Sequence, residues 1–234
     1  MLPLTTCTDQ KAHCQPLHVG RYVEGKGESP RTGARRTTRG HLVIRFSSIV
    51  VNKGPGRLEL VGSRPNTKTP DLKLAQNVYQ TDGHIRRVPT RAVAYYEHAD
   101  GHQHFHVQAF EEMRLRAVGS RTWRNGHKEG FCVGADYRLV RNVGERQLYD
   151  DCGDGKPNLL AIKERLAPGW VDDYSWYLWG QYINLDGLKL PGNFCLSATV
   201  DPKRMFLETT RSNNTASTLV HITATGATVI RQGC

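Results

Sequence analysis

The stretch His41-Leu-Val-Ile-Arg-Phe-Ser-Ser-Ile-Val-Val51 is apolar and rich in β-branched residues, and the turn sequence Asn52-Lys-Gly-Pro-Gly56 follows it. β-Branched side chains favour strands, and glycine and proline mark the turns that end them. Residues 57–61 then alternate between polar and apolar side chains, which is the pattern of a returning strand. This part of the chain predicts paired β-strands.

Short strand-like segments recur along the rest of the chain, at 92–96, 113–118, 128–133, 136–141, 176–185, 194–200, 219–223 and 227–231. Residues 62–90 are rich in Pro, Asn, Thr and Asp and predict mostly loop, and the segment with helical periodicity is 158–166. Many short strands separated by turn residues predict a mostly β fold, with an antiparallel β-sandwich core, long loops and little helix.

The composition of the 234-residue sequence indicates how the chain is divided into domains and which binding partners its charge favours. We expect a loop-rich extension over 1–39 and one globular domain over 40–234, and no apolar run approaches the length of a membrane span. A formal net charge of +10 predicts attraction to polyanions such as wall polymers. The basic stretch with Arg31, Arg35, Arg36 and Arg39 lacks aromatic residues, so it predicts a solvated loop rather than a specific nucleic-acid interface.

Six cysteines form no CxxC pair, which argues against a zinc ribbon or a thioredoxin-like site. Their even number suits three disulfides, and the simplest of the alternative pairings join Cys7 to Cys14, Cys132 to Cys152 and Cys195 to Cys234. Disulfides form in oxidising compartments, so we expect secretion. The start of the sequence lacks the charged and apolar segments of a signal peptide, so we expect that a leader was removed.

Three histidines alternate in His102-Gln-His104-Phe-His106, and His98 lies upstream of them. Residues spaced by two share one face of a β-strand, so the three imidazoles would converge on one point. Neutral imidazole is the commonest protein ligand for copper, zinc and iron. The spacing predicts a metal site on a strand flanked by paired neighbours, but it does not name the metal.

Several short stretches of the sequence resemble characteristic stretches of the lysyl oxidase family. They occur in the same order along the chain as in the family, over about residues 40–234. The first is the histidine segment itself, which is similar to the family's copper-binding segment. The others are His41–Phe46 with Asn52 and Gly54, Gly126-His-Lys128-Glu-Gly-Phe-Cys132, Pro168-Gly169 with Asp172 and Tyr174, Gln181-Tyr-Ile-Asn-Leu185, Pro191-Gly-Asn-Phe194, Val200-Asp-Pro202 and Asn213-Asn214. Each string alone is a weak signal, but their collinearity is a strong one.

The resemblance implies a secreted copper amine oxidase that oxidises primary amines with O₂ and releases aldehyde, hydrogen peroxide and ammonia. Carried over motif by motif, His102, His104 and His106 are the copper ligands, and His98 is left out because it does not fall on a family position. Lys128 and Tyr174 are the precursors of the cofactor lysine tyrosylquinone. Asp172 stands at the position of the family's proposed catalytic base.

The resemblance also bears on substrates and on a second metal. The implied substrate is a small primary amine or a lysine-containing protein or peptide. Glu208, Asn213 and Asn214 resemble part of a calcium site in animal relatives, but Thr210 replaces an acidic residue of that pattern. Calcium is therefore left open rather than predicted.

Three departures from the family pattern concern cysteines. Trp170 and Gly180 occupy the two positions of the family's disulfide across the tyrosine loop, and Gly101 replaces the cysteine before the copper histidines. Cys195 has no counterpart in the pattern. These changes question how rigidly the loop around Tyr174 is held.

Two alternatives remain beside the amine oxidase. His104, His106 and Glu111 fit the first metal-binding motif of cupin-type oxygenases or isomerases, although Pro191-Gly192 is not followed by the histidine of the second motif. The other alternative is a non-catalytic secreted β-domain that binds copper through its histidines and polyanions through its charge. It predicts that Lys128 and Tyr174 remain unlinked.

Overall fold

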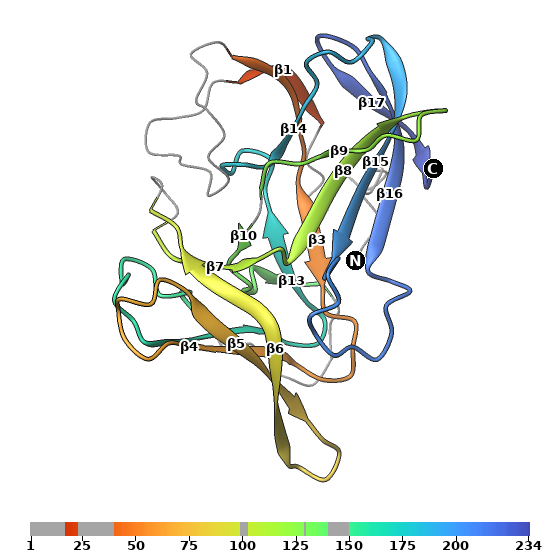
Figure 1. Cartoon of the computed structure of the whole chain (residues 1–234). Coiled ribbons are helices and arrows are strands. Elements are labelled where there is room, and N and C mark those ends of the chain that lie inside the picture. Colours follow the sequence, from red (N-terminus) through yellow and green to blue (C-terminus); the bar gives the residue numbers. More distant parts are fainter. Residues whose placement is uncertain (1–16, 23–39, 99–102, 129, 140–149) are drawn as a thin grey trace.

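The computed structural model describes residues 17–22, 40–98, 103–128, 130–139 and 150–234 (Figure 1). Within these residues the regular secondary structure consists of β-strands, without a helix. The prediction of a mostly β, antiparallel fold is confirmed. Every ladder between the strands is antiparallel, and one isolated parallel bridge joins Thr218 to Gly233.

The strands form four sheets. The six-stranded sheet has the order β10 (Gly130–Phe131), β7 (Phe105–Gln108), β6 (Ile85–Tyr96), β5 (Leu72–Tyr79), β4 (Leu58–Ser63) and β12 (Ala161–Leu166). The five-stranded sheet has the order β17 (Ala227–Gln232), β16 (Thr215–Ile222), β15 (Gly192–Val200), β8 (Glu111–Ala117) and β9 (Arg124–Asn125). The two three-stranded sheets are β11 (Tyr137–Arg138), β13 (Trp170–Tyr174), β3 (Ser48–Val51) and β1 (His18–Tyr22), β2 (His41–Arg45), β14 (Tyr182–Asn184).

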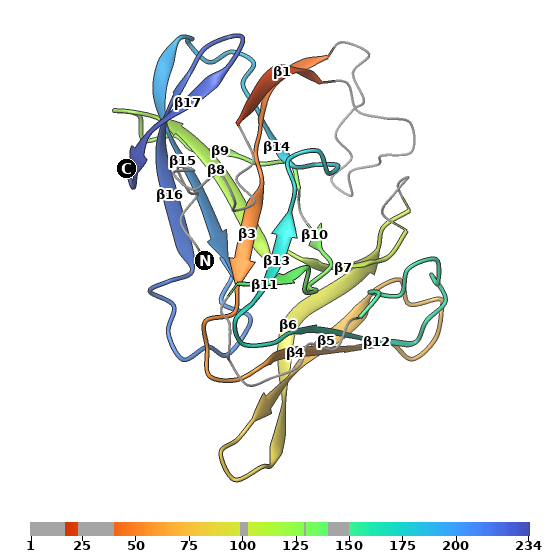
Figure 2. The ribbon, with the colours of Figure 1, turned by 180° about the vertical axis from the view of Figure 1, so that it is seen from behind.

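Most side chains that point between the sheets are apolar. In β8 the burial alternates, so that Met113 and Leu115 face the core while Arg114 lies toward the surface. Phe46, Phe105 and other buried residues contributed by all four sheets form one hydrophobic cluster. Figure 2 shows β3 and β13 in the middle of the molecule, between the six-stranded and five-stranded sheets. These two strands therefore carry their side chains into the interior.

Two expectations about local structure are wrong, and one predicted strand is divided into two. The segment 62–90 is not mostly loop, because β5 and β6 pair as a hairpin that extends from the body of the protein (Figure 1). The segment 158–166 is not helical, since Ala161–Leu166 pairs with β4 as an edge strand. The opening stretch is broken at Phe46 and Ser47 into β2 and β3, which belong to different sheets.

Two disulfides connect the described residues. Cys132 is bonded to Cys152, and Cys195 in β15 is bonded to Cys234, in agreement with two of the three expected pairs. The third expected pair, Cys7 with Cys14, lies outside the described residues, as do Arg31, Arg35, Arg36 and Arg39. No helix that could span a bilayer is found within the described ranges. The division into 1–39 and 40–234 stays a prediction, and β1, from the first part, pairs with β2.

Candidate active site

Lys128 and Tyr174 lie next to each other in the interior. Lys128 lies in the short connection between β9 and β10, and Tyr174 is the last residue of β13. The Nζ atom of Lys128 lies 4.9 Å from the centre of the Tyr174 ring. Both residues are buried, with 4% of Lys128 and 6% of Tyr174 exposed to solvent. The ring of Phe131 contacts both, at 5.2 Å from Nζ and 4.6 Å from the Tyr174 ring centre. Forty-six positions of sequence thus separate two side chains that the fold brings together.

Both groups have strongly altered proton affinities. Burial lowers the pKa of Lys128 to about 8, although Asp172, Glu97 and Glu111 act in the opposite direction. No hydrogen-bond partner of its Nζ atom is present among the described residues. Burial, reinforced by Asp172 and Glu164, raises the pKa of the Tyr174 phenol well above its usual value. The amine therefore loses its proton at a much lower pH than an ordinary lysine does, and the phenol holds its proton more strongly than an ordinary tyrosine.

His104 and His106 point toward each other. His106 lies in β7 with 1% exposure, His104 directly precedes the strand, and their Nε2 atoms are 2.8 Å apart. The strand is flanked by β6 and β10, which confirms the expectation of paired neighbours on both sides. His102 lies outside the described residues, and His98 is exposed and packs against Tyr96.

The histidine pair suits a metal ion in its donor chemistry. Burial, followed by the positive charge of Lys128, lowers the pKa of His104, which favours the neutral imidazole that metals bind. Two ring nitrogens aimed at one point are part of the donor set that copper prefers. Within the described ranges no three His, Cys, Asp or Glu side chains gather into a metal site. His104, His106 and Glu111 are all described, so the cupin motif is not assembled.

Asp172 is the third expected site residue, and it faces the same side of β13 as Tyr174. It is 4% exposed, and one carboxylate oxygen, Oδ2, has no hydrogen-bond partner among the described residues. Burial, followed by the charges of Asp136, Glu111 and Glu164, raises its pKa well above the usual value. A hydrogen bond from the Gly134 backbone opposes this effect. The Asp172 carboxylate therefore binds a proton more strongly than an ordinary aspartate does.

Two further buried carboxyl groups surround the site. Glu111 in β8 is 2% exposed, and burial raises its pKa to about 7. Glu164 in β12 is fully buried, accepts a 2.8 Å hydrogen bond from the Val133 backbone, and has a pKa well above the usual value because of burial. Sequence reasoning did not assign either residue to this site. The available signal was periodicity, because each glutamate is in phase with the buried apolar residues of its strand.

Two glycines allow the backbone to approach the site closely. A Cβ atom on Gly130 would lie 2.7 Å from the Cβ of His106, and it would also clash with the Tyr95 hydroxyl. Gly180 has a positive φ of 71°, and a Cβ there would lie 3.3 Å from the Cα of Lys128. The residue at the position of the missing family disulfide thus packs directly against the backbone of Lys128.

Aromatic residues cover the region beside Lys128. The ring of His127 stacks on Tyr182 with centres 4.8 Å apart and meets Trp179 edge to face at 5.7 Å. Trp176 stacks on His18 at 3.7 Å. Tyr177 is 62% exposed and does not contribute to a closed wall. The aromatic cover beside Lys128 is therefore formed by Trp179 and Tyr182 around His127, with Trp176 packed on His18.

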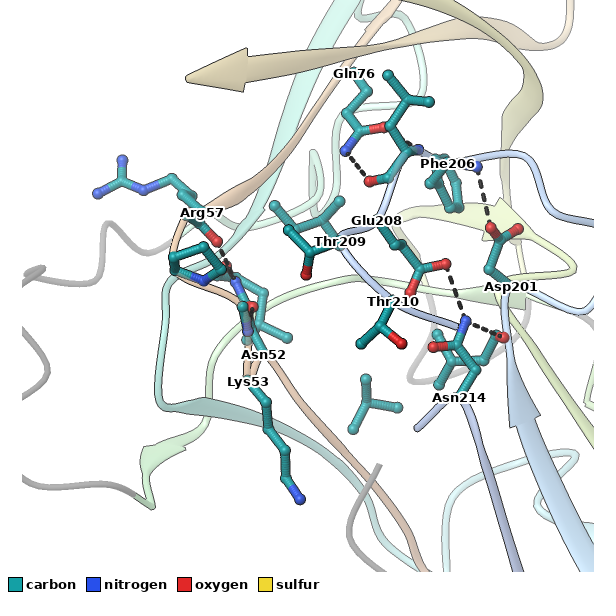
Figure 3. Close-up of a pocket in the computed structure, with 18 of the residues that line it drawn as sticks. Asn52, Lys53, Arg57, Gln76, Asp201, Phe206, Glu208, Thr209, Thr210 and Asn214 are labelled. Atoms are coloured by element: carbon teal, nitrogen blue, oxygen red, sulfur yellow. Dashed lines mark hydrogen bonds between the residues drawn. The ribbon is translucent and has the colours of Figure 1, made fainter. Parts of the chain in front are cut away.

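A separate cavity of about 280 Å³ contains the residues that resemble the calcium site (Figure 3). Glu208 accepts hydrogen bonds from Asn214 at 2.9 Å and from the Arg211 guanidinium at 3.0 Å. Arg211 also bonds to Asp201 at 2.9 Å and to the carbonyl oxygen of Phe206. One guanidinium thus bonds to both carboxylates and offsets one of their two negative charges.

The comparisons with known proteins give the same family as the short strings. The family model described as Lysyl oxidase matches residues 59–234. Protein-lysine 6-oxidase of Sus scrofa is 28% identical over 168 residues, which cover 70% of this chain and 60% of that protein. Protein-lysine 6-oxidase of Gallus gallus is 28% identical over 61% of this chain and 31% of that protein, and lysyl oxidase homolog 1 of Homo sapiens is 27% identical over 65% and 25%. The chain spans less than two thirds of the length of each of these relatives.

Proposed function

The chain belongs to the lysyl oxidase family, and from this membership we propose that it is a copper-dependent amine oxidase. Its reaction converts a primary amine to an aldehyde and consumes O₂, with release of hydrogen peroxide and ammonia. The observation that carries the proposal is the distance of 4.9 Å between Nζ of Lys128 and the ring centre of Tyr174, in a buried site.

His102, His104 and His106 are the proposed copper ligands. The Nε2 atoms of His104 and His106 converge to 2.8 Å, and His104 is biased toward its neutral form, which supports this assignment. Copper with O₂ supplies the oxidation of the Tyr174 ring that joins it to Lys128, and the linked pair, lysine tyrosylquinone, supplies the oxidation of the amine. Calcium is not part of the proposal, because Arg211 already forms ion pairs with Asp201 and Glu208.

The protein's own residues hold the reacting groups in position, exclude water from them and set their proton affinities. Formation of a bond between Nζ and the ring needs a neutral amine close to the ring, and burial favours both conditions. Phe131 contacts both groups and excludes water from the space between them. Asp172 is the proposed acceptor of the proton from the substrate carbon, since its raised pKa gives its carboxylate a high proton affinity.

The proposed substrates are small amines and lysine side chains in proteins or peptides. The net charge of +10 opposes the approach of cationic amines over long distances and favours association with an anionic polymer. The two disulfides support an oxidising location outside the cell.

Peptide mass mapping of copper-loaded, aerated protein tests the proposal. We expect one cross-link between the peptides that carry Lys128 and Tyr174, and none in Lys128→Arg or Tyr174→Phe. Lys163→Arg and Tyr177→Phe are matched controls, because these side chains are exposed and should leave the cross-link intact.

Copper titration provides the second arm of the test. His104→Gln and His106→Gln should weaken copper binding, whereas the exposed His98→Gln should not. Unmodified Lys128 and Tyr174 peptides at full copper occupancy would remove the oxidase assignment and favour the non-catalytic copper-binding domain. A cross-linked protein is then assayed with a panel of amines for peroxide release.

A further inference from the structure

Arg114 and Arg116 lie on the face of the five-stranded sheet that points away from the core. They alternate in β8 with the buried residues Met113 and Leu115, and successive side chains of a strand point to opposite faces. Because the two arginines are two positions apart, their Cα atoms are separated by about 7 Å. β8 therefore presents two neighbouring guanidinium groups on the outer face of the sheet.

One indole ring holds both guanidinium groups. The central guanidinium carbon of Arg116 lies 4.5 Å from the centre of the Trp123 ring, and that of Arg114 lies 5.0 Å from it. Glu112 adds an ion pair of 3.2 Å to the Nε atom of Arg114. Arginine is attracted to aromatic rings through its charge and its planar shape. These contacts fix the two guanidinium groups before any ligand arrives.

The strands of this sheet carry little negative charge. Glu111 and Glu112, at the start of β8, are the carboxylate side chains in the five strands. Glu111 is buried, and Glu112 is paired with Arg114. Arg116 has no carboxylate partner among the described residues, and Arg121, in the connection between β8 and β9, is exposed. A surplus of positive charge raises the local concentration of anionic ligands.

Hydroxyl groups border the two arginines on the same face. The register of the ladders places Ser217 in the row of Arg114, and Thr199 and Thr215 in the next row. The hydroxyl oxygens of Thr199 and Thr215 are 3.0 Å apart, and all three side chains are at least partly exposed. A hydroxyl group both donates and accepts hydrogen bonds. These rows therefore suit a ligand that is itself rich in hydroxyl groups.

A third guanidinium lies across the sheet from the first two. The ladder runs from Arg116 through Cys195 and Leu219 to Arg231, so three strand spacings, or about 14 Å, separate the two arginines. Arg231 donates a 3.1 Å hydrogen bond to the carbonyl oxygen of Cys234, which is disulfide-bonded to Cys195. The positive charge thus extends over the width of the face.

We propose that this face of the five-stranded sheet binds an acidic polysaccharide through Arg114 and Arg116, with Trp123 as their positioning residue. A guanidinium forms two parallel hydrogen bonds to a carboxylate, and sulfate oxygens accept the same bonds. The serine and threonine rows contact the sugar hydroxyls. The association is non-covalent and does not depend on the oxidase chemistry. It gives a defined place to the attraction that the net charge exerts on anionic polymers.

The side chains of this face favour a polysaccharide over other polyanions. Proteins that bind single-stranded nucleic acids stack successive bases on several aromatic side chains. Here one ring, that of Trp123, is already in contact with two guanidinium groups. An acidic peptide would supply carboxylates but would leave the hydroxyl rows largely unmatched. A chain of acidic sugars satisfies both the cations and the hydroxyl groups.

A second pair of arginines lacks these features and provides a matched control. Arg86 and Arg87 are exposed on the β5–β6 hairpin, which projects away from the five-stranded sheet (Figure 1). Neither forms an ion pair or packs on an aromatic ring within the described part of the chain. Ordering a free arginine side chain costs conformational entropy, and this cost lowers affinity. The hairpin pair thus has the same charge without the fixed geometry.

Calorimetric titration of the full chain tests the proposal at physiological ionic strength. The probes are a short heparin oligosaccharide and an oligogalacturonate. Arg116→Gln should weaken binding about 10-fold, and Arg114→Gln/Arg116→Gln about 100-fold. Arg86→Gln/Arg87→Gln removes the same charge and should keep nearly the wild-type affinity. Equal losses in the two double variants would overturn the inference, because net charge alone would then explain the binding.

Two variants that preserve the charge separate fixed geometry from attraction. Arg114→Lys/Arg116→Lys keeps both cations but loses the planar fork, and Trp123→Leu keeps both arginines but removes the ring that holds them. Each should weaken saccharide binding several-fold. The lysine variant decides the question if Trp123→Leu does not fold. Wild-type affinity in the lysine variant would overturn the assignment of a guanidinium site.

Three further probes identify the class of ligand. Neutral dextran should not bind, and oligoglutamate and single-stranded DNA of matched charge should bind more weakly than the two acidic saccharides. Tighter binding of the peptide or of the DNA would overturn the polysaccharide assignment. Absence of saccharide binding by the wild type would reject this inference alone, whereas absence of the Lys128–Tyr174 cross-link would reject the proposed function.

Discussion

The phenol of Tyr174 donates a 2.7 Å hydrogen bond to the carbonyl oxygen of Cys132. Cys132 is in turn disulfide-bonded to Cys152. The carbonyl oxygen of Cys152 accepts a 2.8 Å hydrogen bond from the backbone N–H of Phe105, which lies between His104 and His106. The disulfide therefore connects the tyrosine with the histidine strand. It holds this region in a protein that lacks the family's disulfide across the tyrosine loop.

Removal of this disulfide should impair both stability and cofactor formation. The Cys132→Ala/Cys152→Ala variant should lose about 3 kcal/mol of unfolding free energy, since the bond closes a loop with a sequence separation of 20. It should also cross-link Lys128 and Tyr174 more slowly, because the acceptor of the phenol is less well fixed. Denaturant unfolding and peptide mapping measure the two effects.

The second disulfide is the control for this prediction. Cys195 and Cys234 are 39 positions apart, so the double alanine variant should lose about 4 kcal/mol. It should nevertheless cross-link at the wild-type rate in folded protein, because this bond joins β15 to Cys234 and does not involve the segments that carry Lys128, Tyr174 or the histidines. Equal slowing in both variants would mean that general instability causes the effect.

Lys128→Met should stabilise the metal-free, unlinked protein at neutral pH. The lysine pKa falls from 10.5 in the unfolded chain to about 8 in the folded protein, which corresponds to roughly 3 kcal/mol of penalty below pH 8. Between about pH 8 and 10.5 the unfolded state binds more protons, so wild-type stability rises with pH. The difference between wild type and variant should therefore shrink across this range in denaturant titrations.

A constant difference from pH 7 to pH 10 would contradict a buried ammonium at this position. Lys163→Met is the matched control, because Lys163 is exposed on the neighbouring edge strand and its stability effect should not depend on pH in this window.

Gly130→Ala should disturb the metal site through the backbone. The added methyl group would lie 2.7 Å from the Cβ of His106, so β10 must shift away from β7. We expect a loss of about 1–3 kcal/mol of stability and weaker copper binding, measured by thermal unfolding and copper titration. Gly134→Ala, where nothing lies within 4 Å of the new atom, should leave both unchanged.

Arg211→Gln tests whether the Arg211 side chain takes the place of a metal cation beside Asp201 and Glu208, two residues that line the cavity in Figure 3. The variant loses the bonds to Asp201 and Glu208 and should be destabilised by about 2 kcal/mol. Addition of calcium to metal-free wild-type protein should not raise its melting temperature. A clear rise would show that calcium displaces Arg211 and would contradict this account of the loop.

Several features of this protein could be predicted from the sequence because they depend on neighbouring residues. Alternating and β-branched segments indicated the mostly β fold. The HxHxH spacing predicted three converging imidazoles, and the two that lie within the described residues, His104 and His106, do converge. The errors at 62–90 and 158–166 have a common cause. Strand formation depends on a partner strand, and the partners of β5, β6 and β12 are fixed by the sheet rather than by local composition.

The family assignment also followed from sequence, because collinear short strings survive in the order of the chain. What only the tertiary structure decided is the environment of each side chain. Glu111 and Glu164 are ordinary charged residues in the sequence, and burial between sheets raises the pKa of Glu111 to about 7 and that of Glu164 well above its usual value. Desolvation acts through every element that covers a group, so no local pattern specifies it. For the same reason, the contact between Lys128 and Tyr174 exists only once β3 and β13 lie between the sheets.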